Sequence, residues 1–311
     1  MSITSLLLKR FPLSKGELLT YINTCPFRYK TFPIEKRGGG SPRLISQPSK
    51  DLKVVQRYIL ESYLEDKLKI HDVATAYRSG RSIMDNVRPH LKNPYLLKMD
   101  FRDFFPSITG EDFVAYLNDN QILVDDIERE YLTKIFFKNE SGNLVLSVGS
   151  PGSPLISNAI MYQFDRIIDE YCKSMSISYT RYSDDLTFST ERKGVLFKFP
   201  ETVNRFIADL PYPNLKIHSE KTVFSSKKFN RHVTGITVSN DGNPSIGHNE
   251  KRSIRSRIYN SHQLDSKGML SLRGYLSFIG QVEPETLRRL WEKYPNQMHR
   301  IAHFRDELQQ D

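Results

Sequence analysis

The sequence predicts an α+β fold, in which short antiparallel strands and amphipathic helices form separate segments. Apolar and aromatic side chains alternate with polar ones on both sides of Ser183-Asp184-Asp185, a pattern typical of a β-hairpin with acids at its tip. Residues 52–64 and 155–175 instead carry apolar side chains at helical spacing. The chain contains no internal repeat and no linker long enough to separate independent domains.

The first hundred residues are expected to alternate helices with short strands. Thr24-Cys25-Pro26 ends one helix, and Pro48-Ser49 precedes the next. The expected elements are a helix over residues 13–22, a glycine-rich turn over 37–42, a strand over 43–46, a helix over 52–64, a basic loop over 74–82, a short helix over 83–91 and a strand over 95–100.

The remaining residues continue this alternation. Asp125 and Asp126 suit the start of a helix, because the helix dipole favours acids there. The expected elements are helices over residues 111–117 and 125–137, a strand over 143–147, a rigid loop over 148–154, one long helix over 155–175, the hairpin over 178–189, a helix over 199–210, strands over 215–217, 221–225 and 232–238, and a mostly helical tail over 250–311.

Charge and composition favour a polyanionic partner. The 311 residues include 45 Lys and Arg against 36 Asp and Glu, a net charge of +9. Nine Lys and Arg, against three acids, fall within residues 213–260, and clustered cations gain free energy by releasing counterions from nucleic acid. No run approaches the roughly 18 apolar residues of a membrane span, and the N-terminus does not have the form of a secretory signal. We therefore expect no membrane partner and a cytoplasmic location.

Three aspartates at strand ends form the candidate catalytic site. Asp100 ends an apolar strand, while Asp184 and Asp185 lie at the hairpin tip, so pairing of strand and hairpin would bring the three carboxylates together. Carboxylates at such distances repel one another and need a cation. Two Mg²⁺ ions held by carboxylates activate an attacking hydroxyl and stabilise a leaving pyrophosphate, which is the chemistry of nucleotidyl transfer. For the hairpin tip alone, the alternative is a surface turn, because Asp and Ser favour turns.

Motifs over about residues 40–240 resemble, in order, those of reverse transcriptases. The match lies in five stretches. They occur in the same order as in the family, which makes chance similarity a poor explanation. These are residues 43–49 and 77–82, which resemble the two finger motifs, residues 100–105, which resemble the first catalytic-aspartate motif, residues 149–154, which resemble the G-x-P-x-S-P loop, and Tyr182-Ser183-Asp184-Asp185, which matches the catalytic tetrad.

Within that family the chain resembles bacterial retron reverse transcriptases. Residues 86–90 resemble the retron N-A-x-x-H signature, with Val87 in place of Ala, and Val233-Thr234-Gly235 matches the V-T-G signature. Val148 stands where the family usually has Gln. From the length of 311 residues we expect no appended endonuclease or ribonuclease H domain. A group II intron-like or diversity-generating reverse transcriptase is the alternative enzyme, and a non-catalytic RNA-binding module is the alternative from another class.

The resemblance implies a right-hand polymerase fold with fingers, a palm whose antiparallel sheet packs on helices, and a helical thumb. It implies an N-terminal helical extension over residues 1–35, fingers over 36–95, a palm over 96–240 with fingers elements around 111–148, and a thumb over 241–311. It also implies an RNA-directed DNA polymerase that uses dNTPs and recognises a structured non-coding RNA encoded beside it. Such an enzyme starts synthesis from the 2′-hydroxyl of a guanosine, makes branched single-stranded DNA (msDNA), and commonly serves anti-phage defence with an effector protein.

The resemblance also assigns roles to single residues. Asp100, Asp184 and Asp185 would hold two Mg²⁺ ions, with the carbonyl of Phe101 as a further ligand. Phe105 would be the steric gate that excludes ribonucleotides, although aromatic residues more often belong to the core. The other nucleotide-binding candidates are Arg43 and Arg78, which would grip the triphosphate, Gly149 of the loop, and Lys221, which would donate a proton to the pyrophosphate.

Two regions are expected to bind the RNA: residues 86–90, and the basic stretch from Lys227 into the thumb helix with Lys251, Arg252, Arg255 and Arg257. Arg252, Arg255 and Tyr259 lie at i, i+3 and i+7, so one helix face would present two cations and an aromatic ring. A solvated basic helix is the alternative interpretation of this face. By resemblance alone, the remaining RNA-binding candidates are Asn86, His90, Val233, Thr234 and Gly235.

Overall fold

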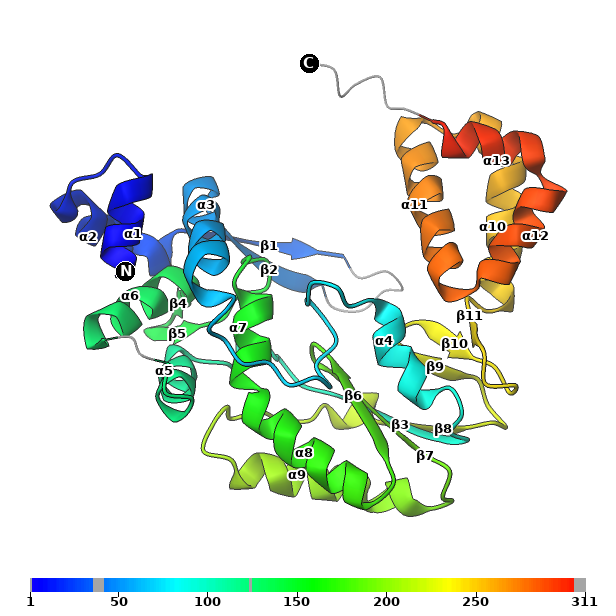
Figure 1. Ribbon diagram of the computed structural model, residues 1–311, viewed down its shortest axis with the longest axis horizontal. Coiled ribbons are helices and arrows are strands. Elements are labelled where there is room, and N and C mark those ends of the chain that lie inside the picture. The colour runs from blue at the N-terminus through cyan, green and yellow to red at the C-terminus, as the bar shows by residue number, and fades with distance from the viewer. Residues whose placement is uncertain (1, 36–41, 123–124, 305–311) are drawn as a thin grey trace.

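The computed structural model describes residues 2–35, 42–122 and 125–304, and a four-stranded antiparallel sheet lies at its centre (Figure 1). The strand order is β6-β7-β3-β8, so the hairpin pairs with the strand that ends in Asp100, as predicted. The glycine-rich turn expected over residues 37–42 falls almost wholly outside the described residues. The strands of the central sheet are β3 (Tyr95–Asp100), β6 (Ser178–Tyr182), β7 (Asp185–Thr190) and β8 (Val223–Ser226).

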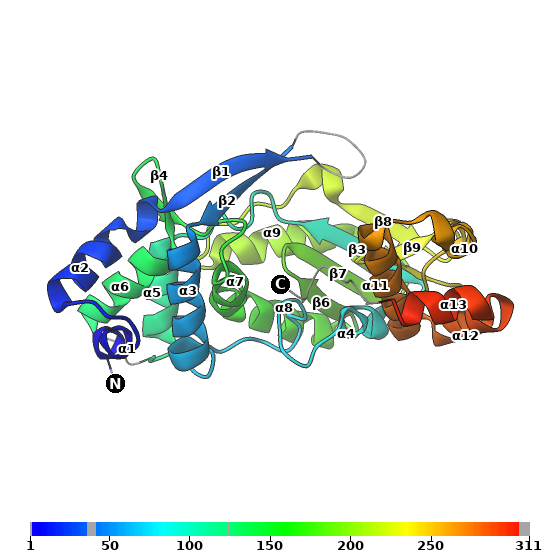
Figure 2. The same ribbon diagram turned by 90° about the horizontal axis from the view of Figure 1, so that it is seen from above.

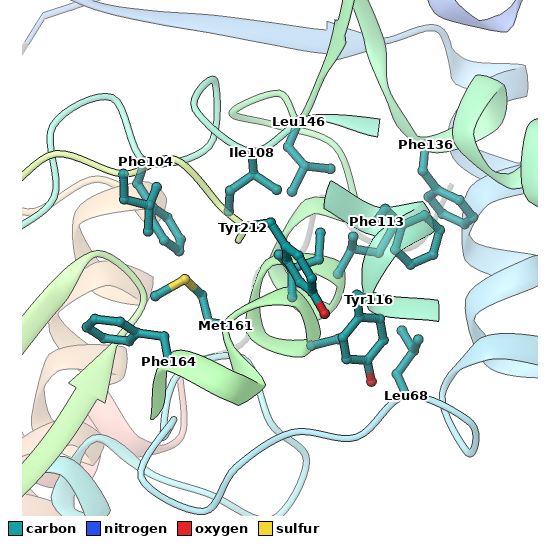
Figure 3. Packing of buried hydrophobic residues seen from close by; sticks show 14 of the residues in the cluster. Leu68, Phe104, Ile108, Phe113, Tyr116, Phe136, Leu146, Met161, Phe164 and Tyr212 are labelled. Atoms are coloured by element: carbon teal, nitrogen blue, oxygen red, sulfur yellow. The ribbon is translucent and has the colours of Figure 1, made fainter. Parts of the chain in front are cut away.

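Helices α7 (Ser153–Ile160), α8 (Tyr162–Ser174) and α9 (Phe199–Asp209) accompany the sheet, and α8 and α9 lie along one of its faces (Figure 1). The single helix predicted over residues 155–175 is wrong, because the chain bends at Met161. Figure 3 shows the Met161 side chain pointing into the core beside Phe104 and Phe164, where it is fully buried. An apolar stripe that continues through such a bend does not reveal it.

The N-terminal half surrounds the same core with helices and two small hairpins. One hairpin joins β1 to β2 and the other joins β4 to β5, and the β4 strand was not predicted. The elements are α1 (Ile3–Arg10), α2 (Lys15–Thr24), a 3₁₀ turn (Cys25–Phe27), β1 (Tyr29–Ile34), β2 (Arg43–Pro48), α3 (Lys50–Ile59) with a π-helical turn (Leu60–Leu64), α5 (Gly110–Asp119), α6 (Asp126–Phe136), β4 (Lys138–Glu140) and β5 (Asn143–Val145).

The C-terminal part forms a second core at the far end of the molecule from α1 and α2 (Figures 1 and 2). Met84, Val87 and Leu96 from the first hundred residues belong to this core. The elements that build it are α4 (Ile83–Val87) with a 3₁₀ turn (Arg88–His90), β9 (Arg231–Val233), β10 (Ile236–Val238), β11 (Pro244–Ser245), α10 (His248–Tyr259), α11 (Ser266–Val282), α12 (Pro284–Lys293) and α13 (Pro295–Ala302).

Two strands predicted between residues 215 and 238 differ from the structure. The strand expected over residues 232–238 is a hairpin, because Thr234 and Gly235 adopt left-handed backbone angles (φ 45° and 83°) and turn the chain between β9 and β10. Residues 215–217 form no strand, and their one bridge pairs Ile217 with Phe101. The predicted helical tail is confirmed by α10 to α13 as far as residue 304.

Candidate active site

Strand register brings the three aspartates to one end of the central sheet. Asp100 lies directly opposite Asp185 in the β3–β7 pair, and Asp184 lies in the turn before β7. The backbone N–H of Phe101 donates a hydrogen bond of 3.1 Å to the carbonyl of Asp184, which joins the turn to the strand beside it. Directly opposed residues of antiparallel strands point to the same face, so Asp100 and Asp185 share one face.

Burial and neighbouring negative charge raise the pKa of two of the carboxyl groups. Burial raises the pKa of Asp184 above its ordinary range, and the negative charge of Asp100 adds to the rise. Burial, together with the charges of Asp184 and Asp100, raises the pKa of Asp185 to about 6. The positive charges of Lys221 and Arg43 counteract part of the rise at Asp184. An accumulation of negative charge of this kind is the environment in which a hard cation binds.

One cation of the protein already contacts this cluster. The Nζ atom of Lys221 lies 2.7 Å from Asp100 Oδ1, and the lysine side chain is half exposed. Within residues 2–35, 42–122 and 125–304, no set of three or more His, Cys, Asp or Glu side chains has its ligand atoms gathered around a single point. The donor set, three carboxylates with the Phe101 backbone next to them, nevertheless fits Mg²⁺, which prefers oxygen ligands.

A buried ion pair beneath the turn fixes its backbone. Arg181 is fully buried, and its guanidinium donates to both carboxylate oxygens of Asp165, which is also fully buried, at 2.6–3.1 Å. Its remaining Nη1 atom donates to Asn158 Oδ1 and to the carbonyl of Ser183, both at 3.0 Å. The hydroxyl of Tyr179 donates to Asp165 at 2.9 Å. Ser183 has a left-handed backbone (φ 60°), so this network holds a strained residue directly before Asp184.

Sequence reasoning missed this pair. Arg181 adjoins the catalytic tetrad, and an arginine inside an otherwise alternating strand is the signal that could have drawn attention to it. No sequence pattern connects it to Asp165, because the contact depends on how α8 packs against β6.

The two arginines that are candidates for nucleotide binding differ in their surroundings. Arg43 is exposed at the start of β2, and its charge reaches Asp184. Arg78 is bonded within its own loop, where Nη1 donates to the carbonyls of His71 and Ala74 and contacts Asp72. Of the two arginines, Arg43 is therefore the one whose charge lowers the pKa of an aspartate in the cluster.

Phe105 and Gly149 are placed by close packing. Phe105 is partly buried, and its ring lies 5.3 Å from that of Phe104, centroid to centroid. Gly149 has a positive φ of 115°, and a Cβ atom there would lie 3.0 Å from Ile45 Cγ2. The N–H of Ser46 donates to the carbonyl of Val148 at 2.9 Å, so the glycine loop lies against the strand that begins with Arg43. Glycine is needed here for its backbone angle and for the close approach.

Three of the residues expected to contact RNA are buried. Asn86, His90 and Val233 are each 0% exposed, which does not agree with direct contact between these side chains and a partner. His90 instead joins the two strands of the β6–β7 hairpin, with one hydrogen bond between Nδ1 and the Ser189 hydroxyl and another between Nε2 and the Thr180 hydroxyl, at 2.7 and 2.8 Å. The physical reason is that a polar side chain in a core is stable when its hydrogen bonds are satisfied.

Asn86 joins the β6–β7 hairpin to the β9–β10 hairpin. Its Oδ1 accepts from Thr75, its backbone carbonyl accepts from Thr180 of β6, and its Nδ2 donates to Thr234 Oγ1 at 3.4 Å. Thr234 itself is partly exposed and Gly235 is exposed. The retron-like residues therefore lie together, and the exposed part of the group is the turn.

The predicted face of the C-terminal helix α10 is at the surface. Arg252, Arg255 and Tyr259 are exposed, and the tyrosine is 64% accessible. Between them Ile254 and Ile258 point into the second core, so one side of the helix packs and the other is exposed. No helix in the described part of the chain has the length and apolar character needed to cross a membrane.

Comparisons with known proteins agree with this arrangement. The family model for reverse transcriptase (RNA-dependent DNA polymerase) matches residues 34–238. The retron Ec83 reverse transcriptase of Escherichia coli is 40% identical over 272 residues, which cover 86% of each chain. The retron Ec86 reverse transcriptase of E. coli is 33% identical over 280 residues, covering 89% of this chain and 84% of that protein. A solved structure of telomerase from Candida albicans aligns with a TM-score of 0.49 and 10% identity over 89% of this chain and 55% of that one.

The family match spans both the strand of Asp100 and the hairpin of Asp184 and Asp185. The right-hand polymerase fold expected from the sequence is consistent with these helices and sheets and with that match. The chain belongs to the reverse transcriptase family, within it to the bacterial retron reverse transcriptases, and it is an RNA-directed DNA polymerase.

Proposed function

We propose that this polymerase copies part of a structured non-coding RNA encoded beside it into branched single-stranded DNA (msDNA). Synthesis would start from the 2′-hydroxyl of a guanosine in that RNA, and the product would serve anti-phage defence together with an effector protein. The observation that carries this proposal is the alignment of Asp100 with Asp185, beside Asp184, in a chain 40% identical to a retron reverse transcriptase.

The cofactor of the proposed reaction is a pair of Mg²⁺ ions held by Asp100, Asp184, Asp185 and the carbonyl of Phe101. Bound there, the ions would activate the attacking hydroxyl and stabilise the charge of the leaving pyrophosphate. The raised pKa values of Asp184 and Asp185 support this assignment, because they result from burial and from neighbouring negative charge, and a bound cation stabilises carboxylates in such a place. Lys221 holds an ammonium group at Asp100, and its half-exposed side chain is able to turn toward a phosphate and donate a proton.

The incoming dNTP would be held by residues around the aspartates. Arg43 would pair with the triphosphate, since its charge already reaches Asp184, and Arg78 would contribute from the neighbouring loop. Phe105 would exclude a 2′-hydroxyl, and its partly exposed ring beside Phe104 suits that task. Gly149 would allow the loop backbone to approach the nucleotide.

The RNA would be bound through the exposed face of Arg252, Arg255 and Tyr259 and through the turn at Thr234 and Gly235. Asn86, His90 and Val233 would act indirectly, by holding this turn and the catalytic hairpin in place. We assign residues 1–35 to an N-terminal extension and residues 36–95, 96–240 and 241–311 to fingers, palm and thumb. Fingers elements around 111–148 lie within the palm range.

The test is co-expression with a short inverted-repeat RNA encoded beside the gene. We expect single-stranded DNA that stays joined to RNA after denaturation and changes mobility when a debranching enzyme cleaves the 2′,5′ linkage. Asp184→Asn is the matched control, because it should fold and yield no DNA. If the wild-type chain extends an ordinary primer–template but makes no branched DNA from any neighbouring RNA, the proposal of msDNA synthesis fails while the polymerase activity stands.

A further inference from the structure

A groove with exposed aromatic rings lies at the outer edge of the central sheet. Its volume is about 250 Å³, and Phe197, Phe224 and Phe229 line it together with Tyr95 and Lys193. The three phenylalanines are 69%, 42% and 70% exposed, and the ring centroids of Phe197 and Phe224 lie 5.5 Å apart. Large apolar side chains that gather at a surface mark an interaction site, because their contact with water is unfavourable and binding a partner removes it.

The groove is separate from the catalytic site. Phe224 of the edge strand β8 lies opposite Leu97 of β3, and Leu97 belongs to the buried core, whereas Asp100 lies three residues further along on the other face. Tyr95 is five residues from Asp100, which at about 3.3 Å per residue is roughly 17 Å along the strand. A group bound in the groove therefore does not touch the reacting atoms.

The two chain segments that carry the three phenylalanines are charged with one sign. The segments 192–198 and 223–229 contain no acidic residue. They carry five exposed basic residues, which are Arg192, Lys193, Lys198, Lys227 and Lys228.

Rings together with lysines distinguish between possible occupants. Protein interfaces are enriched in aromatic residues but depleted in lysine. A protein partner would therefore explain the phenylalanines but not the lysines beside them. The volume lies below the roughly 300–1,000 Å³ typical of small-molecule pockets, so the groove suits one planar group of a larger chain. Exposed aromatic rings along a basic path are the features that bind single-stranded nucleic acid, because bases stack on the rings and phosphates pair with the cations.

We infer that this groove is a second nucleic-acid contact, which holds a single-stranded segment while the catalytic site works on another part of the strand. Bases stack on Phe197 and Phe229, and Lys193, Lys227 and Lys228 pair with the phosphates. The inference goes beyond the proposed function, since it depends neither on a branched product nor on a metal.

The experiment measures binding of fluorescein-labelled single strands, dT₁₂ and rU₁₂, to protein whose catalytic cleft is already filled with an unlabelled primer–template duplex. Stacking on an aromatic ring is worth about fivefold or more in affinity per base, so Phe197→Ala/Phe229→Ala should bind at least about tenfold more weakly. Phe27→Ala is the matched control, because Phe27 is 71% exposed but lies in the 3₁₀ turn after α2. It should bind like the wild-type chain, and all three proteins should extend a short primer at similar rates.

Two further measurements keep the inference falsifiable if the double variant folds poorly. A 5-iodouracil base in the single strand should photocrosslink to peptides that contain Phe197 or Phe229. Lys227→Glu/Lys228→Glu should lower the dependence of affinity on salt concentration. Stronger binding of dT₁₂ would identify the DNA product as the occupant, and stronger binding of rU₁₂ would identify the RNA.

The inference is overturned if the double phenylalanine variant binds both strands as tightly as Phe27→Ala does, or if the crosslinks fall elsewhere. Loss of a co-purifying protein with unchanged binding of the single strands would make the groove a protein-docking surface and would equally overturn it. Loss of primer extension together with strand binding would mean that the rings serve the fold.

Discussion

The two hairpin turns that carry functional candidates are held in opposite ways. The turn of the β6–β7 hairpin, which carries Asp184, is anchored from beneath by Arg181, which is fully buried and bonded to Asp165 and to the carbonyl of Ser183. The turn of β9–β10 ends in the exposed Gly235, and Asn86 donates to Thr234 at 3.4 Å, near the limit for a hydrogen bond. Both turns include a left-handed residue other than glycine.

This difference corresponds to what each turn is proposed to do. A turn that positions carboxylates around metal ions needs a fixed backbone, and the cost of burying an ion pair beneath it is offset only by near-complete hydrogen bonding. A turn that meets RNA has to remain accessible. Asn86 contacts both hairpins, so it is the residue through which a change at one is expected to reach the other.

The largest effect is expected at Arg181, which anchors the turn of the β6–β7 hairpin. Arg181→Met leaves the carboxylate of Asp165 buried without its partner, which should lower the free energy of unfolding by about 3–5 kcal/mol. Primer extension should fall as well, since Ser183 loses its support. Urea unfolding measures the first effect. Arg166→Met is the control, because its exposed pair with Glu170 is worth at most about 0.5 kcal/mol. Equal stability of the two variants would contradict the role given to Arg181.

A pH dependence should follow from His90, which joins the strands of the same hairpin. Burial lowers the pKa of His90 to about 3, against roughly 6.5 in the unfolded chain. Between these values the unfolded state binds more protons, so the stabilisation is complete above pH 6.5 and is lost as the pH falls toward 3. The expected loss between pH 7 and pH 5 is about 2 kcal/mol.

The measurement is the free energy of unfolding at a series of pH values in wild type and His90→Gln. The variant should be less stable at pH 7 and should change less with pH. His248→Gln, at an exposed position, serves as the control. A pH slope that persists unchanged in His90→Gln would assign the dependence to other groups.

A smaller effect is expected at the junction between the two hairpins. Asn86→Ala removes hydrogen bonds to Thr75 and Thr234 and should lower the free energy of unfolding by about 1 kcal/mol. Branched DNA from the cognate RNA should fall more than extension of an ordinary primer–template. Asn204→Ala, an exposed asparagine on α9, should change neither. Equal loss in both assays would mean that Asn86 serves the catalytic centre alone.

The smallest effect on stability is expected at the exposed face of α10. Arg255→Ala should leave the free energy of unfolding within about 0.5 kcal/mol of wild type, because the side chain is exposed. Affinity for the RNA should fall, and the slope of log affinity against log salt should decrease by about one for the lost phosphate contact. Arg289→Ala, on α12, is the matched control. An unchanged salt slope in Arg255→Ala would remove the α10 face from the RNA-binding surface.

Much of the local structure could be predicted because it depends on neighbouring residues. The strand that ends in Asp100 was predicted with its observed bounds, and the hairpin with Asp184 at its turn was predicted by alternation and turn residues. The break at Met161 and the turn at Thr234-Gly235 were missed. In each case the sequence pattern continues through a bend, which distant packing allows at Met161 and two left-handed residues allow at Thr234-Gly235.

For the candidate site, the sequence by itself determined that Asp100 ends a strand and that Asp184 and Asp185 lie at the tip of a hairpin, because strand ends and turns are local properties. The pairing of that strand with the hairpin is a contact between distant residues, which tertiary structure decided. Tertiary structure alone decided what holds that site. Two ion pairs, Arg181–Asp165 and Lys221–Asp100, join residues on different elements. Asn86 and His90 are buried by elements that lie far from them in the chain. A hydrogen bond of this kind depends on how one element packs against another, and that packing is a property of the whole fold that no local spacing contains.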